Sequence, residues 1–87
     1  MALPDDFQSA VERSKQLAKR PSNEELLELY ALFKQSTDGD VNGERPGGFD
    51  FKAIAKFDAW VAKKGKTKDQ AMQEYVSFVE KLAASRS

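Results

Sequence analysis

The sequence predicts an all-α protein built as a four-helix bundle, and three observations support this fold class. Four segments repeat their apolar residues at the helical spacings i, i+3, i+4 and i+7. Helix breakers separate the segments, namely Pro21, a loop rich in Asp, Gly and Asn over residues 38–50, and Gly65. No segment shows the apolar–polar alternation that predicts a strand. At 87 residues the chain is short, so we expect one domain over 1–87 with a modest core.

The first two predicted helices flank Pro21. The first has a suitable first turn at Asp5 and ends near Arg20. The residues of this helix that fall at the spacings i, i+3, i+4 and i+7 are Phe7, Ala10, Val11, Ser14, Leu17 and Ala18. The second opens with a capping box, in which Ser22 and Glu25 can each satisfy a free backbone N–H, and Gly39 is its predicted stop.

The last two predicted helices flank Gly65. Asp50 can cap a helix that runs from 51 to about 64 and that Gly65 closes. Thr67 and Gln70 form a second capping box for the fourth helix. The apolar stripe of that helix is Met72, Tyr75, Val76, Val79, Leu82 and Ala83. The connection over 38–50, between the second and third helices, is long, so the bundle need not be a simple up-and-down one.

The composition argues against catalysis and against a metal centre. The chain has no cysteine and no histidine, so it lacks a thiol nucleophile, the usual general base and the commonest metal ligand. We therefore expect no enzyme activity and no cofactor. The first six residues do not resemble a secretory signal, and Ala2 replaces the glycine that myristoylation needs. No apolar run is long enough to span a bilayer, so we expect a cytoplasmic protein.

Charge is balanced overall but unevenly distributed. The 14 basic residues equal the 14 acidic ones, yet residues 52–68 hold six lysines and a single acid, Asp58. Such a surface suits a compact anionic ligand. Nucleic-acid binding is not expected, because the isoelectric point is about 6.3 and Lys63, Lys64 and Lys66 sit where a helix C-terminus favours cations.

One loop imitates a calcium site. Residues 38–43 (DGDVNG) place oxygen-bearing side chains at positions 1, 3 and 5 of an EF-hand loop and Gly at position 6. The pattern requires a bidentate Glu at position 12, where this chain has Phe49. We therefore expect no metal there.

A set of aromatic and basic residues can be assembled from helical spacing. Tyr30, Phe33 and Lys34 share one face of the second predicted helix. Lys52 and Lys56 are an i, i+4 pair on the third, and Tyr75 lies on the fourth. An anionic ligand between the two lysines would relieve their mutual repulsion. From spacing alone, half-buried tyrosines and solvated lysines explain the same residues.

Four segments make the sequence similar to a known family. These are 30–40 (YALFKQSTDGD), 44–47 (ERPG), 50–52 (DFK) and 56–60 (KFDAW). Together they closely resemble the acyl-CoA-binding protein family, also called diazepam-binding inhibitor, and the resemblance covers about residues 5–84. It implies an up-down-down-up bundle that holds its ligand in a surface bowl between helices.

The resemblance also implies roles for basic residues. Tyr30 and Lys34 would hold the 3′-phosphate of the CoA ribose by hydroxyl and ammonium. Lys56 would lie against the CoA head group and its phosphates. Lys52 and Lys15 would add positive charge nearby.

Aromatic and apolar residues take further roles by the same resemblance. Tyr75 would line the bowl next to the adenine or the pantetheine portion. Phe33 stands where the family commonly has Tyr next to the adenine, so a ring remains but a hydroxyl is lost. Phe57 replaces a common Trp and Ser36 a common Ala. The side chains implied to shelter the acyl chain lie on the second helix and near Phe7, Ala10 and Leu27.

The implied function is non-covalent binding of medium- and long-chain fatty acyl-CoA esters, by a monomer that acts as an intracellular carrier and pool former. Transient contacts with acyl-CoA-using enzymes or membranes go with that role. The alternative is a helical protein-interaction module with no lipid ligand. An acyl-CoA thioesterase would need a nucleophile and a base that the sequence does not offer.

Overall fold

The structure is a computed structural model that describes residues 3–85. The first two and last two residues, including Ala2 and both limits of the predicted domain, lie outside the described residues. Four helices follow in order, α1 (Leu3–Ser14), α2 (Asn23–Thr37), α3 (Phe51–Val61) and α4 (Lys68–Ser85). Between residues 3 and 85 there is no strand. The predicted all-α fold class is confirmed.

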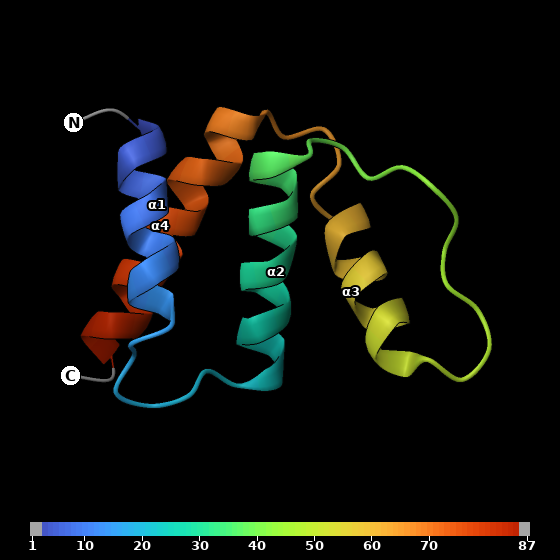
Figure 1. Cartoon of the computed structure of the whole chain (residues 1–87), viewed down its shortest axis with the longest axis horizontal. Helices are drawn as coiled ribbons and strands as arrows, with labels where there is room; N and C mark the ends of the chain where they lie inside the picture. The colour runs from blue at the N-terminus through green and yellow to red at the C-terminus, as the bar shows by residue number, and fades with distance from the viewer. Residues whose placement is uncertain (1–2, 86–87) are drawn as a thin grey trace.

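The helices have the predicted up-down-down-up order. In Figure 1, α2 and α3 run in one direction, and α1 and α4 run in the opposite direction. Helix α4 packs against α1 and α2, whereas α3 packs against α2 alone in the part of the chain that the structure describes. The principal extents of the molecule are 39 × 27 × 15 Å, so its thin dimension is little more than the ~10–12 Å diameter of one helix.

The core lies between α1, α2 and α4. The ring of Phe7 packs edge-on against that of Tyr75, with centroids 5.1 Å apart. The buried core side chains are Phe7, Ala10, Leu29, Leu32, Tyr75, Val79 and Leu82. No side chain of α3 is fully buried. Helix α3 is therefore held in place by contacts of partly exposed side chains and not by side chains buried in the core.

Polar contacts fasten α3 and its flanking loops. The indole nitrogen of Trp60 donates to the carbonyl of Gly39 at 2.9 Å. Arg45 donates two hydrogen bonds of 2.8 Å to the carboxylate of Asp58, which joins the long loop to α3. Both of these charged side chains are half exposed, so their pair contributes less than the partly buried indole contact.

A buried amide joins three segments. Gln35 is 0% exposed, and its Nε2 donates to Asp40 Oδ1 and to the carbonyl of Lys66, each at 2.8 Å. Asp40 Oδ1 also accepts from the backbone N–H of Gly65 at 2.9 Å. These bonds hold the end of α2, the loop 38–50 and the α3–α4 connection together.

The predicted start signals are confirmed. Ser22 and Glu25 form both bonds of a capping box at α2. Asp50 accepts from the backbone of Ala53 at α3. At α4 the second capping box has bonds of 2.9 and 3.0 Å between Thr67 and Gln70.

Two helices end earlier than predicted. Helix α1 ends at Ser14 instead of near Arg20, because two i→i+3 bonds tighten the turn at 15–16 and Leu17 turns back to pack on the core. Helix α3 ends at Val61 instead of near 64, because similar i→i+3 bonds wind residues 62–66 into a tight turn.

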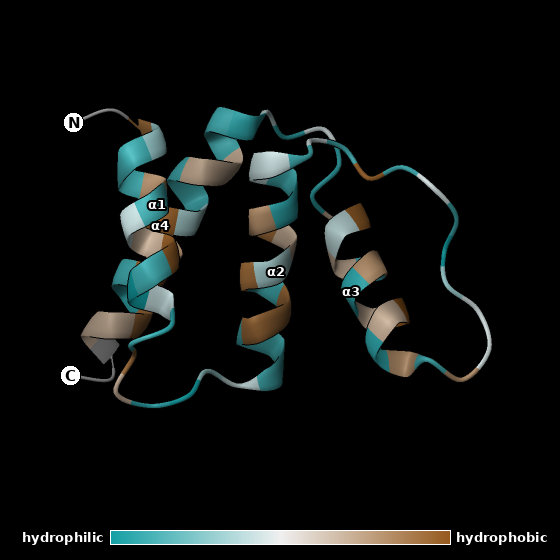
Figure 2. Ribbon diagram, viewed as in Figure 1, coloured by the Kyte–Doolittle hydropathy of each residue, from teal (hydrophilic) through white to brown (hydrophobic). Residues whose placement is uncertain are grey.

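Every helix combines hydrophilic and hydrophobic residues, as the colours of Figure 2 show. Among the described residues, none of the helices has the length and apolar character needed to cross a membrane. Their apolar faces are instead used for the core and for the grooves described below.

Stability should be constant from about pH 5.5 to 8 and should fall below about pH 4. The chain has no histidine to titrate in the upper range. The Gly65 N–H and the Gln35 amide lower the pKa of Asp40, and the ion pairs with Lys34 and Arg45 lower those of Asp38 and Asp58. Carboxyls with lowered pKa values stabilise the fold fully above their ordinary pKa of 3.8 and lose this contribution as the pH falls through the folded value. Urea midpoints across the pH range test this, and a decline already between pH 8 and 5.5 would contradict it.

Candidate functional site

Two hollows share a wall on one side of α2. The first lies between α2 and α3 and has a volume of about 480 Å³. The second lies between α1, α2 and α4 and has a volume of about 620 Å³. Arg20, Leu26 and Tyr30 line both hollows, so the two adjoin each other. We call them together the binding groove.

The binding groove brings together most of the predicted site residues. Its α2–α3 part is lined by Tyr30, Lys52 and Lys56, and its other part by Lys15, Phe33 and Tyr75 as well as Tyr30. Lys15 follows the last turn of α1, whereas the others lie on α2, α3 and α4. Lys34 is the exception, because it lines neither part of the groove.

Two lysine–aromatic contacts join α2 to α3. The Nζ of Lys56 lies 5.4 Å from the centre of the Tyr30 ring, and the Nζ of Lys34 lies 5.0 Å from the Trp60 ring. Each contact is one turn from the other on both helices, because α2 and α3 are parallel and their i, i+4 positions meet in the same order. Cations at this distance are attracted to the ring face.

Lys34 is engaged with an acid. Its Nζ forms an ion pair with Asp38 Oδ2 at 2.5 Å, and 28% of its side chain is exposed. The hydrogen bond that its ammonium donates to Asp38 raises the pKa of Lys34, so the ammonium stays charged at neutral pH. Lys34 therefore carries its positive charge at the edge of the groove, one turn beyond Tyr30.

Tyr75 is more deeply buried than a lining residue need be. The residue is 4% exposed, and its hydroxyl donates to Ser14 Oγ at 3.2 Å. Burial raises the pKa of this hydroxyl, which stays neutral at physiological pH. Phe33 is 37% exposed and stacks at 5.9 Å on Phe7, so its ring offers an apolar face to the groove.

The apolar side chains that the resemblance implies to shelter an acyl chain are divided between the groove and the core. Leu27 lines the α2–α3 part of the groove. Phe7 and Ala10 are 6% and 4% exposed and belong to the core, where they support the groove from below.

Sequence reasoning missed Arg20 and Phe51. Arg20 was assigned to the end of a helix, but α1 stops earlier and the connection 15–22 runs along the groove. Leu26 is one of the apolar residues of α2 that the resemblance implies to shelter an acyl chain, and it lines both parts of the groove. Phe51 is 71% exposed at the start of α3. Such exposure of a large ring indicates a binding surface, and it could be seen only in the structure.

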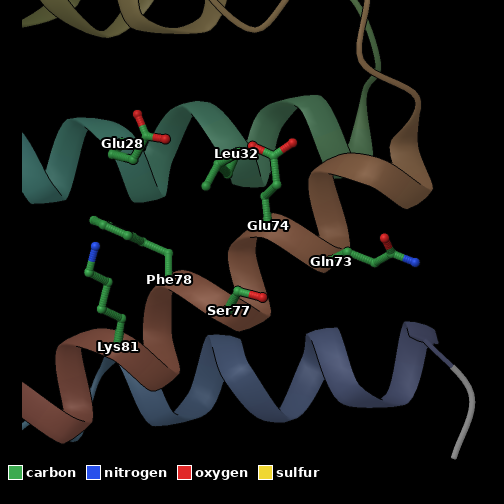
Figure 3. A pocket seen from close by; sticks show the side chains of 7 residues that line it. All are labelled: Glu28, Leu32, Gln73, Glu74, Ser77, Phe78 and Lys81. Atoms are coloured by element: carbon green, nitrogen blue, oxygen red, sulfur yellow. The ribbon is translucent and has the colours of Figure 1, made fainter.

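The lysines of residues 52–68 do not form one patch. Lys63 and Lys66 form ion pairs of 2.6 and 2.7 Å with Glu28 and Glu74. Those two glutamates line a different groove between α2 and α4, of about 420 Å³, into which Phe78 projects (Figure 3). Lys52 and Lys56 are thus the lysines of this segment that line the binding groove.

The carboxylates of the calcium-like loop have other partners. Asp38 pairs with Lys34, and Asp40 accepts from Gln35 and Gly65. Within residues 3–85 no group of three acidic, histidine or cysteine side chains is placed to hold a metal ion.

The fold and the groove define a class of protein. It is a small helical protein with an open groove that is apolar along its floor and basic along its rim, and no group of side chains among the described residues is placed to hold a metal ion. Such a surface is suited to holding a ligand that has both an apolar and an anionic part.

Comparison with known proteins identifies the family. The profile of the family described as acyl CoA binding protein matches residues 4–79. An acyl-CoA-binding protein homolog of Drosophila melanogaster is 50% identical over 82 residues, 94% of this chain and 95% of the relative. An acyl-CoA-binding protein of Brassica napus is 49% identical over 82 residues, 94% of this chain and 89% of the relative. The chain belongs to the acyl-CoA-binding protein family.

Solved structures agree. The crystal structure of Oryza sativa acyl-CoA-binding protein 2 has a TM-score of 0.92 and 42% identity, and the match covers 97% of this chain and 93% of that one. The solution structure of acyl coenzyme A binding protein from yeast has a TM-score of 0.72 and 43% identity over 93% of this chain and 94% of that one.

Proposed function

We propose that this protein binds medium- and long-chain fatty acyl-CoA esters non-covalently and serves as their intracellular carrier and pool former. The observation that carries the proposal is the binding groove itself, in which apolar side chains lie between basic ones. Its family membership supports the same ligand class.

The basic rim would hold the CoA head group. Tyr30 and Lys34 take the 3′-phosphate, and Lys56 contacts the head group phosphates. Lys52 and Lys15 supply further positive charge. Charge-assisted hydrogen bonds of this kind contribute roughly 1.5–3 kcal/mol each, so they decide which acylated molecule is accepted.

The apolar floor would hold the acyl chain and the rings. Phe33 and Tyr75 lie beside the adenine or the pantetheine, and Leu27 shelters part of the chain. Each buried methylene contributes about 0.8 kcal/mol. Burial in a groove this open is incomplete, so the chain supplies only part of its full contribution.

The carrier acts without chemistry, as one domain and one copy of the chain. With neither histidine nor cysteine in the sequence, the thioester has no ordinary base or thiol to attack it. We place the protein in the cytoplasm, in transient contact with acyl-CoA-using enzymes or membranes. A helical interaction module without a lipid ligand is disfavoured by the match to the family over residues 4–79.

Native mass spectrometry of the purified protein tests the function. We expect an added mass equal to CoA plus an acyl chain after incubation with dodecanoyl-CoA, at one ligand per chain. A thiol reagent should detect no release of free CoA from the same mixture. A protein that stays unliganded would refute the carrier, and steady release of thiol would replace it with an enzyme.

Arg20 should contribute to head group binding although sequence reasoning missed it. Arg20→Ala should weaken dodecanoyl-CoA binding by about three- to fivefold, because an exposed rim cation contributes modestly. Lys19→Ala is the matched control, since it removes the same charge from an exposed neighbour that lines neither part of the groove. Equal losses in the two variants, measured by calorimetry, would show a general charge effect and no contact by Arg20.

A further inference from the structure

The stability of α2 does not explain why an aspartate occupies position 38. It is the C-cap residue of α2, where the helix dipole favours cations over carboxylates. Its ion pair with Lys34 is only partly exposed, with 28% of the Lys34 side chain and 48% of the Asp38 side chain accessible, but Lys precedes Asp, which is the weaker order for an i, i+4 pair. The ion pair therefore makes only a modest contribution to the stability of the fold, and this contribution is lost at low pH.

The same carboxylate controls where the Lys34 ammonium lies. Asp38 holds it at 2.5 Å and the Trp60 ring faces it at 5.0 Å, so Lys34 lines neither part of the groove. Tyr30, one turn earlier on the same face of α2, lines both parts. The ion pair and the Trp60 ring together hold the Lys34 ammonium away from the groove that Tyr30 lines.

We propose that Asp38 is an affinity-determining residue, whose carboxylate competes with a phosphate of the ligand for Lys34 and so weakens the hold on the CoA head group. This inference rests on the proposed function. Lys34 has to leave Asp38 before it contacts a phosphate, and a phosphate near Lys34 meets repulsion from the carboxylate. Both effects favour release of the ligand.

Lys68 makes this exchange feasible. Its charge also lowers the pKa of Asp38, and its Cε lies 3.5 Å from the point where a Cβ on Gly39 would be. Asp38 therefore keeps a cationic neighbour when Lys34 turns to the ligand. The exchange therefore does not leave the Asp38 carboxylate without a nearby positive charge.

Titration calorimetry with two ligands tests the inference. Asp38→Asn should bind dodecanoyl-CoA about three- to tenfold more tightly than wild type. Its affinity for the 3′-dephospho form of that ester should be unchanged, because the competing phosphate is gone. Glu80→Gln is the control, as it removes one exposed acid from α4. It should change neither affinity.

A second arm separates competition from simple repulsion. Lys34→Ala should weaken dodecanoyl-CoA binding by more than about tenfold, and adding Asp38→Asn to it should restore less than about twofold. An equal gain from Asp38→Asn with and without Lys34, or with both esters, would overturn the competition. The competition would also be overturned if wild type binds dodecanoyl-CoA and Asp38→Asn binds it no more tightly. A wild type that binds neither ester would overturn the proposed function and this inference with it.

Discussion

Dodecanoate should bind at least about a hundredfold more weakly than dodecanoyl-CoA. The groove is open and the molecule is only 15 Å thick in its thin dimension, so an acyl chain lies on the surface and is not enclosed. Its methylenes are then incompletely desolvated, and chain burial alone gives a weak complex. The carboxylate of the free acid could replace at most one of the contacts that the rim offers to several phosphates.

Titration calorimetry of both ligands below their micelle concentrations measures the ratio. Added salt should weaken the CoA ester more than the free acid, because the rim contacts are charged and largely exposed. CoA without an acyl chain should still bind detectably. Affinities for acid and ester within about threefold would mean that the apolar floor, not the basic rim, selects the ligand.

Gln35→Leu should lower the free energy of unfolding by about 2–3 kcal/mol. The substitution replaces the amide with an apolar side chain of similar size and removes both hydrogen bonds donated by Nε2. The carbonyl of Lys66 then loses its donor inside the fold, and Asp40 keeps only the bond from Gly65 among those described here. Gln35 Oε1 is buried without a hydrogen-bond partner among the described residues, and its removal offsets part of the loss.

Urea unfolding followed by circular dichroism measures this change. Gln8→Leu is the control, because Gln8 is exposed on α1 and the substitution should change stability by less than about 0.5 kcal/mol. Comparable losses in both variants would mean that the Gln35 amide does not hold the three segments together. Binding of dodecanoyl-CoA to folded Gln35→Leu should be retained, since Gln35 does not line the groove.

The helices could be predicted because their signals are local. The capping boxes at Ser22 and Thr67 and the cap at Asp50 act over three residues, and the structure has all of them. The helix ends near Ser14 and Val61 were missed, because tightening of a last turn depends on where the next apolar residue must pack. Leu17 supplies that reason at α1.

The binding groove could be predicted only in part. Lys52 and Lys56 were found from an i, i+4 spacing, whereas Arg20 was missed because it depends on the path of the connection 15–22. The burial of Gln35 was likewise invisible, since its partners lie at Asp40 and Lys66 in other segments.

By itself, the sequence determined four helices, their caps, the absence of histidine and cysteine, and a motif pattern similar to one family. Only the tertiary structure decided which lysines line the groove and which form ion pairs on the other side of α2. It also decided that Lys34 faces Trp60 and Asp38 at the edge of the groove. The physical reason is that helices form from contacts within one turn, whereas these pairings depend on the parallel register of α2 and α3, which the long loop 38–50 and the packing of the core set together.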